Sequence, residues 1–147
     1  MTPTILVLDG EQRAALAVVR SLGRRGYRIH VGDSTQRSLA GSSRYASTEV
    51  LLPDPMSSSG KYAADVVEAC HNIGAGLVLP ITEASWLAVL AHHADFSEGM
   101  LPDMDLRRFQ QACDKAGVLA IARALGMDVL EEYPHPGQSG SSAGIPS

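Results

Sequence analysis

Polar and charged side chains gather at three points of this chain, each directly after a short apolar run. Asp9-Gly10-Glu11-Gln12-Arg13 follows residues 4–8, Asp33-Ser34-Thr35 follows residues 27–31, and Thr82-Glu83 follows residues 77–81. The carboxyl ends of parallel strands meet at one sheet edge, where helix N-termini present unpaired N–H groups and a positive dipole end. If the apolar runs are such strands, the three segments converge on a site for a small polar ligand.

Five residues of these segments are the candidate substrate-binding residues, and each type has a physical role to offer. Gly10 permits close approach of the backbone to a ligand, and Arg13 can clamp a carboxylate or phosphate through two hydrogen bonds. Glu83 can accept a hydrogen bond from an amine or hydroxyl. Glu11 and Thr82 complete the mixture of donors and acceptors.

A purely structural interpretation of the same residues stays open. Asp9 and Thr82 are residue types that cap helices, and Glu11 and Glu83 lie where acids in a first helical turn favour the helix dipole. Arg13 then has no role beyond being solvated. The sequence alone does not separate this interpretation from a binding site.

Other chemistries find little support in the sequence, so we assign no catalytic residue and no metal ligand. His92 and His93 are adjacent and point about 100° apart on a helix, which prevents them from chelating one metal. Cys70 lies on an apolar helical face as a small hydrophobic residue, and Tyr62 and Trp86 are expected to pack. A nicotinamide-binding domain is a further functional hypothesis. The lack of a G-x-G-x-x-G pattern after the apolar run at residues 4–8 disfavours it.

Apolar periodicity predicts the elements that must position the candidate residues. Strands are expected over residues 4–8, 27–31, 48–52 and 77–81, with a short edge strand at 100–102, and helices are expected to end near Gly26, Gly74 and Gly126. Alternating strands and helices of these lengths predict an α/β fold: a Rossmann-like, doubly wound, mainly parallel sheet with helices on both faces.

Composition describes one ordinary folded domain. The 147 residues are 45% hydrophobic, which suffices for a core, and the net charge of −4 is spread along the chain, so a nucleic-acid partner is not expected. Neither a signal peptide nor a membrane span is predicted, and two cysteines outside any C-x-x-C pair fit a cytoplasmic protein. We predict a domain over residues 1–130 and a disordered Ser/Gly/Pro-rich tail or linker over 131–147.

Four stretches together resemble a known family. "LDGEQRAALAVVRSLGRRGYRIHV", "SLAGSSRYAS", "VLPITEAS" and "CDKAGVLAIARALG" resemble, in their order and spacing, the N-terminal (pre-ATP-grasp) domain of ATP-grasp ligases, of the carbamoyl-phosphate-synthase-like and carboxylate-amine ligase group. The resemblance covers roughly residues 4–129. Its most telling element is the Asp114-Lys115 pair followed by a helix that ends in Leu125-Gly126, which in that family marks the start of the ATP-grasp domain.

The resemblance implies a function for the whole enzyme. Such ligases use Mg-ATP to activate a carboxylate as an acyl phosphate, which an amine then attacks, and strand-end loops of the N-terminal domain supply part of the acceptor site. Those loops correspond to Gly10, Glu11, Arg13, Thr82 and Glu83. Lys115 matches a lysine that approaches the ATP phosphates, although an exposed first-turn lysine is the alternative.

The sequence also departs from the family pattern. The proline that usually follows Leu-Gly closely is delayed to Pro134, and no glycine-rich phosphate loop or late pair of magnesium ligands follows. We therefore expect ATP and Mg only in a full-length ligase, no tightly bound cofactor here, and no ligase activity from these 147 residues alone.

Two functional hypotheses follow. In the first, the chain is the substrate-side domain of a carboxylate-amine ligase, completed by an ATP-grasp domain in cis or in a separate subunit. In the second, it is a stand-alone module that binds a small metabolite or a protein without catalysis. The apolar stripe of Val118, Ile121 and Leu125 predicts either self-association, as in a homodimer, or packing of this helix onto the sheet.

Overall fold

A computed structural model describes residues 2–129 of the protein. The chain divides into two units, Met1–Cys113 and Asp114–Ser147, and each is described by itself. The first contains the sheet, and the second contains helix α5 (Lys115–Ala124). The predicted tail over 131–147 lies outside the described residues, and the predicted domain boundary stays a prediction.

The sheet of the first unit has four strands, all parallel. In the order β3-β2-β1-β4, these are Ala46–Leu51, Arg28–Asp33, Thr4–Leu8 and Leu77–Leu79. β1 pairs with β2 in the register Val7↔Val31 and with β4 in the register Val7↔Leu79. The chain thus builds the sheet outward from β1 to β3 and then crosses back to the other side of β1, which creates a topological switch point between β1 and β4.

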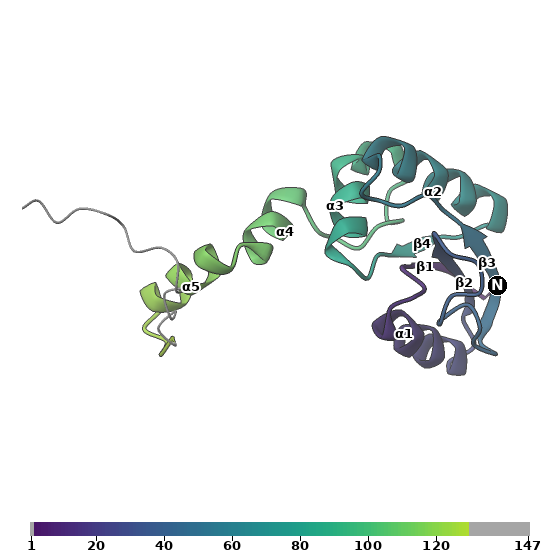
Figure 1. The fold of residues 1–147 in the computed structure, drawn as a ribbon, viewed down its shortest axis with the longest axis horizontal. Helices are drawn as coiled ribbons and strands as arrows, with labels where there is room; N and C mark the ends of the chain where they lie inside the picture. The colour runs from purple at the N-terminus through teal and green to yellow at the C-terminus, as the bar shows by residue number, and fades with distance from the viewer. Residues whose placement is uncertain (1, 130–147) are drawn as a thin grey trace, which may run out of the picture. The chain divides into compact units, whose positions relative to one another are not determined.

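Helices cover both faces of this sheet (Figure 1). Helix α1 (Arg13–Arg24) packs on one face, in a cluster with Val7, Val19 and Val31. On the other face lie α2 (Ser59–Ile73) and α3 (Glu83–Ala91). The 3-10 helix η1 (His93–Asp95) follows α3, and α4 (Leu106–Cys113) packs against α3. The predicted doubly wound α/β fold is confirmed. Because both faces are covered, β1 is apolar along its length rather than alternating.

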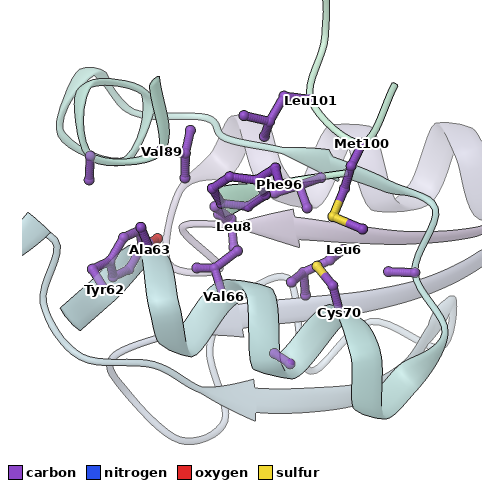
Figure 2. Packing of buried hydrophobic residues seen from close by; sticks show 14 of the residues in the cluster. Leu6, Leu8, Tyr62, Ala63, Val66, Cys70, Val89, Phe96, Met100 and Leu101 are labelled. Carbon is purple, nitrogen blue, oxygen red and sulfur yellow. The ribbon is translucent and has the colours of Figure 1, made fainter. Parts of the chain in front are cut away.

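The core on the α2 face contains Tyr62 and Cys70, two of the side chains that the sequence assigned to packing (Figure 2). Tyr62 and Cys70 are buried there, and burial raises the pKa of the Cys70 thiol to about 11, which keeps it protonated and unreactive. Trp86 packs against the same cluster and stacks on Phe109 of α4, with ring centroids 5.4 Å apart. The packing roles predicted for Tyr62, Cys70 and Trp86 are confirmed.

The ends of the elements follow the expected signals closely. Gly26 and Gly74 follow α1 and α2 with φ angles of 88° and 66°, the left-handed region that favours glycine. Thr82 immediately precedes α3 and its side chain accepts a hydrogen bond from the Ser85 N–H, as a helix cap does. None of the helices within residues 2–129 combines the length and apolar character that crossing a membrane requires.

One predicted element is wrong: residues 100–102 do not form an edge strand. Met100 and Leu101 are buried, and the Met100 carbonyl accepts one backbone hydrogen bond, 2.8 Å long, from the Val78 N–H. Pro102 has no N–H to continue such a ladder. The segment therefore seals the edge of the sheet next to β4 through apolar burial.

Among residues 2–129, one histidine lies inside the sheet layer. His30 of β2 is 7% exposed, and its Nδ1 lies 2.6 Å from the Thr48 hydroxyl of β3. Its Nε2 is buried without a hydrogen-bond partner among the described residues. Burial, with a smaller contribution from the positive charge of Arg28, lowers the pKa of His30 below 6.5. The folded protein therefore favours the neutral imidazole.

This histidine makes the stability of the protein sensitive to acid. As the pH falls below the ordinary pKa of 6.5, the unfolded chain takes up a proton at His30 before the folded chain does. The free energy of unfolding should therefore fall over that interval, by at most about 1.4 kcal/mol per pH unit for one group. Urea unfolding at a series of pH values measures this slope.

Two variants isolate the contribution of His30. The variant His30→Leu should show a flatter slope than the wild type. The control His71→Gln, which changes an exposed histidine of α2, should keep the wild-type slope. Equal slopes for wild type and His30→Leu would place the acid sensitivity elsewhere.

Candidate functional site

The candidate residues lie where the fold has its switch point. β1 is followed by residues 9–12 and α1, β4 is followed by residues 80–82 and α3, and the two strands are neighbours in the sheet. In open α/β sheets this crevice at the carboxyl ends of the strands is the usual position of a ligand. The fold therefore brings the segments with Glu11 and Glu83 to the same edge, as the sequence predicted.

Asp9 joins these two loops. Its carboxylate Oδ2 accepts hydrogen bonds from the backbone N–H of Ile81 (2.9 Å), the backbone N–H of Thr82 (2.8 Å) and the Ser85 hydroxyl (2.6 Å). Its backbone has a φ angle of 62°, a conformation that aspartate tolerates better than most residues. Asp9 thus acts as an anionic cap for α3, not for the helix that follows it in sequence.

Loss of the Asp9 carboxylate should weaken the first unit substantially. The variant Asp9→Ala leaves the N–H groups of Ile81 and Thr82 unpaired and leaves the Ser85 hydroxyl only the Thr82 carbonyl as acceptor. It also puts a side chain with no polar group in the left-handed region, so we expect a loss of roughly 3 kcal/mol in the free energy of unfolding. Asp9→Asn keeps one acceptor oxygen and should lose about half as much. Urea unfolding measures both.

A matched control for Asp9→Ala is Asp54→Ala. Asp54 is exposed and its side chain accepts one hydrogen bond, from the Met56 N–H, so its loss should cost less than about 1 kcal/mol. A cost for Asp9→Ala no greater than that of the control would contradict the bridging role.

Gly10 is explained by packing inside the protein. A Cβ at this position would collide with Ser38 and would lie 2.7 Å from Val31 Cγ1. Its N–H donates to the Gly32 carbonyl and its carbonyl accepts from the Ala40 N–H. The lack of a side chain at Gly10 therefore allows this turn to pack against the loop after β2. Close approach of a ligand to the Gly10 backbone remains a prediction.

A second group of hydrogen bonds fixes the turn next to the end of β2. The Asp33 carboxylate accepts from the Glu11 N–H (3.0 Å), the Thr35 N–H (2.8 Å) and the Thr35 hydroxyl (2.7 Å). The Thr35 hydroxyl oxygen also lies 3.3 Å from Glu11 Oε1. The Glu11 side chain remains exposed beside Asp33, so this part of the edge is acidic and suits a cationic group.

The N-terminus of α1 has the opposite electrostatic character. Gln12 precedes the helix without a capping hydrogen bond from its side chain, and the first turn contains no acid. Arg13 is exposed as the first helical residue. The side chain of Ser58, by contrast, caps α2. Backbone N–H groups and a guanidinium at one helix end favour a carboxylate or phosphate.

Glu83 is exposed in the first turn of α3, and its near neighbour is a residue that the sequence did not single out. Partial burial and the Glu83 carboxylate raise the pKa of the Cys113 thiol at the end of α4. The Thr82 hydroxyl accepts a hydrogen bond from the Ser85 N–H, so Thr82 has at least a structural role as the cap of α3. The spacing of 30 residues between Glu83 and Cys113 carries no signal that sequence analysis could have used.

Lys115 belongs to the second unit, where it is the exposed first residue of α5. Asp114 before it has an extended backbone and makes no side-chain capping bond. Among residues 2–129, no three His, Cys, Asp or Glu side chains are grouped so that they could hold a metal ion.

Neither a family model nor a curated protein sequence matches this chain. Solved structures match it along most of its length. The biotin carboxylase domain of a single-chain bacterial carboxylase has a TM-score of 0.59 and 20% identity over 96% of this chain and 32% of its own. L-amino acid ligase from Bacillus licheniformis has a TM-score of 0.62 and 12% identity over 92% of this chain and 36% of its own. N5-carboxyaminoimidazole ribonucleotide synthetase from Thermotoga maritima has a TM-score of 0.59 and 14% identity over 89% and 33%.

These likenesses establish the fold. The chain spans about a third of the length of the structures that it matches. At the level of fold, the predicted resemblance to the N-terminal domains of ATP-grasp ligases is confirmed. Because the sequence identities are only 12% to 20%, the activities named for these enzymes do not carry over to this chain.

Proposed function

We propose that this chain is the substrate-side N-terminal domain of an ATP-dependent ligase that joins a carboxylate to an amine. The ATP-grasp domain is then contributed in cis or by a separate subunit. The observation that carries this proposal is the switch-point edge, where Asp9 ties the turn with Glu11 and Arg13 to the turn with Glu83. The likeness of the fold to a ligase and a synthetase supports it.

The charges at this edge suggest the class of substrate. Arg13 at the uncapped start of α1 favours a carboxylate or phosphate, while the exposed carboxylates of Glu11 and Glu83 favour an ammonium or a hydroxyl donor. A small molecule with both kinds of group, such as an amino acid, fits this arrangement.

Mg-ATP, when bound to such a ligase, activates the carboxylate as an acyl phosphate. That chemistry is proposed for the ATP-grasp domain, and this chain is proposed to bind and orient the substrate. The proposed contribution of the second unit is Lys115, whose exposed ammonium at the start of α5 approaches the ATP phosphates. The proposed setting is the cytoplasm.

A stand-alone metabolite-binding module is the second candidate function. The observation that favours it is that Met1–Cys113 forms a compact unit with apolar clusters on both faces of its sheet. The mass of the native protein in its source cells separates the two candidates. A mass well above 15.5 kDa supports the ligase, and a mass near 15.5 kDa with no ATP-grasp subunit bound supports the module.

Ligand binding at the switch-point edge should raise the midpoint of thermal unfolding. Standard amino acids, short carboxylic acids, Mg-ATP and NAD are added one at a time, because a ligand at about 100 times its Kd stabilises the folded state by about 2.7 kcal/mol. We expect stabilisation by at least one amino acid or carboxylic acid. Stabilisation by NAD alone would overturn the proposal.

Variants then locate the site of that effect. Arg13→Gln and Glu83→Gln should each weaken binding by roughly tenfold or more, the effect of losing one charged hydrogen bond. The control Glu68→Gln neutralises an exposed carboxylate of α2 and should bind as the wild type does. Equal binding by all three variants would place the ligand away from this edge.

The apolar stripe of α5 should drive association with another protein surface. Val118, Ile121 and Leu125 are 43%, 58% and 73% exposed, although each is apolar. Sedimentation velocity over a concentration series should show self-association of the chain, and the double variant Ile121→Gln/Leu125→Gln should remain monomeric. A wild-type protein that is monomeric at every concentration would contradict this expectation.

A further inference from the structure

A hollow of about 480 Å³ lies on the first unit between α1 and the loop that precedes β3. Six residues line it, and we call it the arginine pocket: Arg20, Arg24, Ser42, Ser43, Arg44 and Tyr45. α1 runs back from the carboxyl ends of the strands, and Tyr45 directly precedes β3. The pocket therefore lies at the edge of the sheet opposite the candidate functional site.

We propose that the arginine pocket binds a small molecule that carries a phosphate monoester. Three guanidinium groups and three hydroxyl groups line it, and no acidic side chain does. Guanidinium groups match the oxygens of phosphate in geometry as well as in charge, and hydroxyls complete the hydrogen bonding. A volume of this size is typical of small-molecule pockets.

Among the described residues, no arginine of this pocket forms an ion pair. The ion pairs within the described part of the chain are Lys61–Asp65, His92–Asp95 and Arg108–Asp105, so none involves an arginine of the pocket. Arg20 and Arg24 are four residues apart on α1, a spacing at which like charges destabilise a helix. A bound dianion would remove this repulsion.

Contacts within the protein shape the pocket in advance. Tyr45 packs against α1 at Gly23, where an added Cβ would lie 2.5 Å from the Tyr45 Cβ. The Arg44 guanidinium lies over the Tyr45 ring, 4.9 Å from its centroid, and donates to the Tyr45 hydroxyl at 2.9 Å. Arg24 Nε donates to the Arg20 carbonyl at 3.1 Å. Two of the three guanidinium groups are thus held in place before a ligand arrives.

The loop that supplies the serines is also fixed. The Ser42 N–H donates to the Ser38 carbonyl, and Ser38 is fully buried. The Glu49 carboxylate of β3 accepts from the Ser38 N–H at 2.8 Å and from the Ser38 hydroxyl at 2.5 Å. A rigid loop reduces the entropy that a ligand must overcome on binding.

Isothermal titration of the full chain tests the proposal with four probes at matched ionic strength. Ribose 5-phosphate and inorganic phosphate should bind, whereas ribose and succinate should not. Binding of ribose 5-phosphate more tightly than phosphate assigns the site to a phosphorylated metabolite. Equal binding of succinate and phosphate would show only general attraction of anions and would overturn the proposal, as would no binding of either phosphate probe.

Paired variants locate the binding. The double variant Arg20→Gln/Arg24→Gln should bind ribose 5-phosphate at least tenfold more weakly than the wild type. Without ligand, the midpoint of thermal unfolding of this variant should be equal to or above that of the wild type. Arg44→Gln tests the third guanidinium without altering α1. The control Arg107→Gln/Arg123→Gln removes the same charge from residues outside the pocket and should leave the affinity unchanged. An equal loss in the control and the pocket variant would overturn the proposal.

Discussion

The three hydrogen bonds accepted by the Asp9 carboxylate organise the rest of the candidate site. They connect the first strand-to-helix turn with the start of α3, two places that β1–β4 pairing brings near each other but does not by itself lock together. The cap also accounts for backbone N–H groups that would otherwise be unpaired at the start of a half-buried helix. Glu11 and Arg13 on one side and Glu83 on the other depend on this link for their common position.

Much of the architecture could be predicted because local and global signals agree. The apolar stripe of α1 and the cap of α3 at Thr82 are each determined by residues close together in the sequence. Burial on both faces makes nearly all of β1 apolar, which also shows in the sequence. Placement of β4 beside β1 is a long-range choice that periodicity does not encode. Helix α4 is not predicted from the sequence, because this helix is polar along most of its length. The packing role of its Phe109 depends on Trp86, on which it stacks and which lies far away in the sequence.

The candidate site was predictable as a location and less so as a set of roles. Chain order alone places segments at the carboxyl ends of strands, so Glu11, Arg13 and Glu83 could be named. The role of Asp9 depends on partners 72 to 76 residues away and on a positive φ angle, and neither can be deduced from residue type. Gly10 shows the same limit, because Ser38 fills the space that its missing side chain leaves.

The difference between the capped and uncapped helices has a consequence for how charge is distributed along this edge. Asp9 neutralises the positive end of α3, whereas α1 keeps its positive end open beside Arg13. Attraction for an anion along this edge is therefore confined to the start of α1, with the exposed Glu11 carboxylate in the turn just before it. Of the two helix N-termini that follow β1 and β4, only that of α1 keeps a positive dipole end that no carboxylate among the described residues offsets, so the edge is electrically uneven before any ligand arrives.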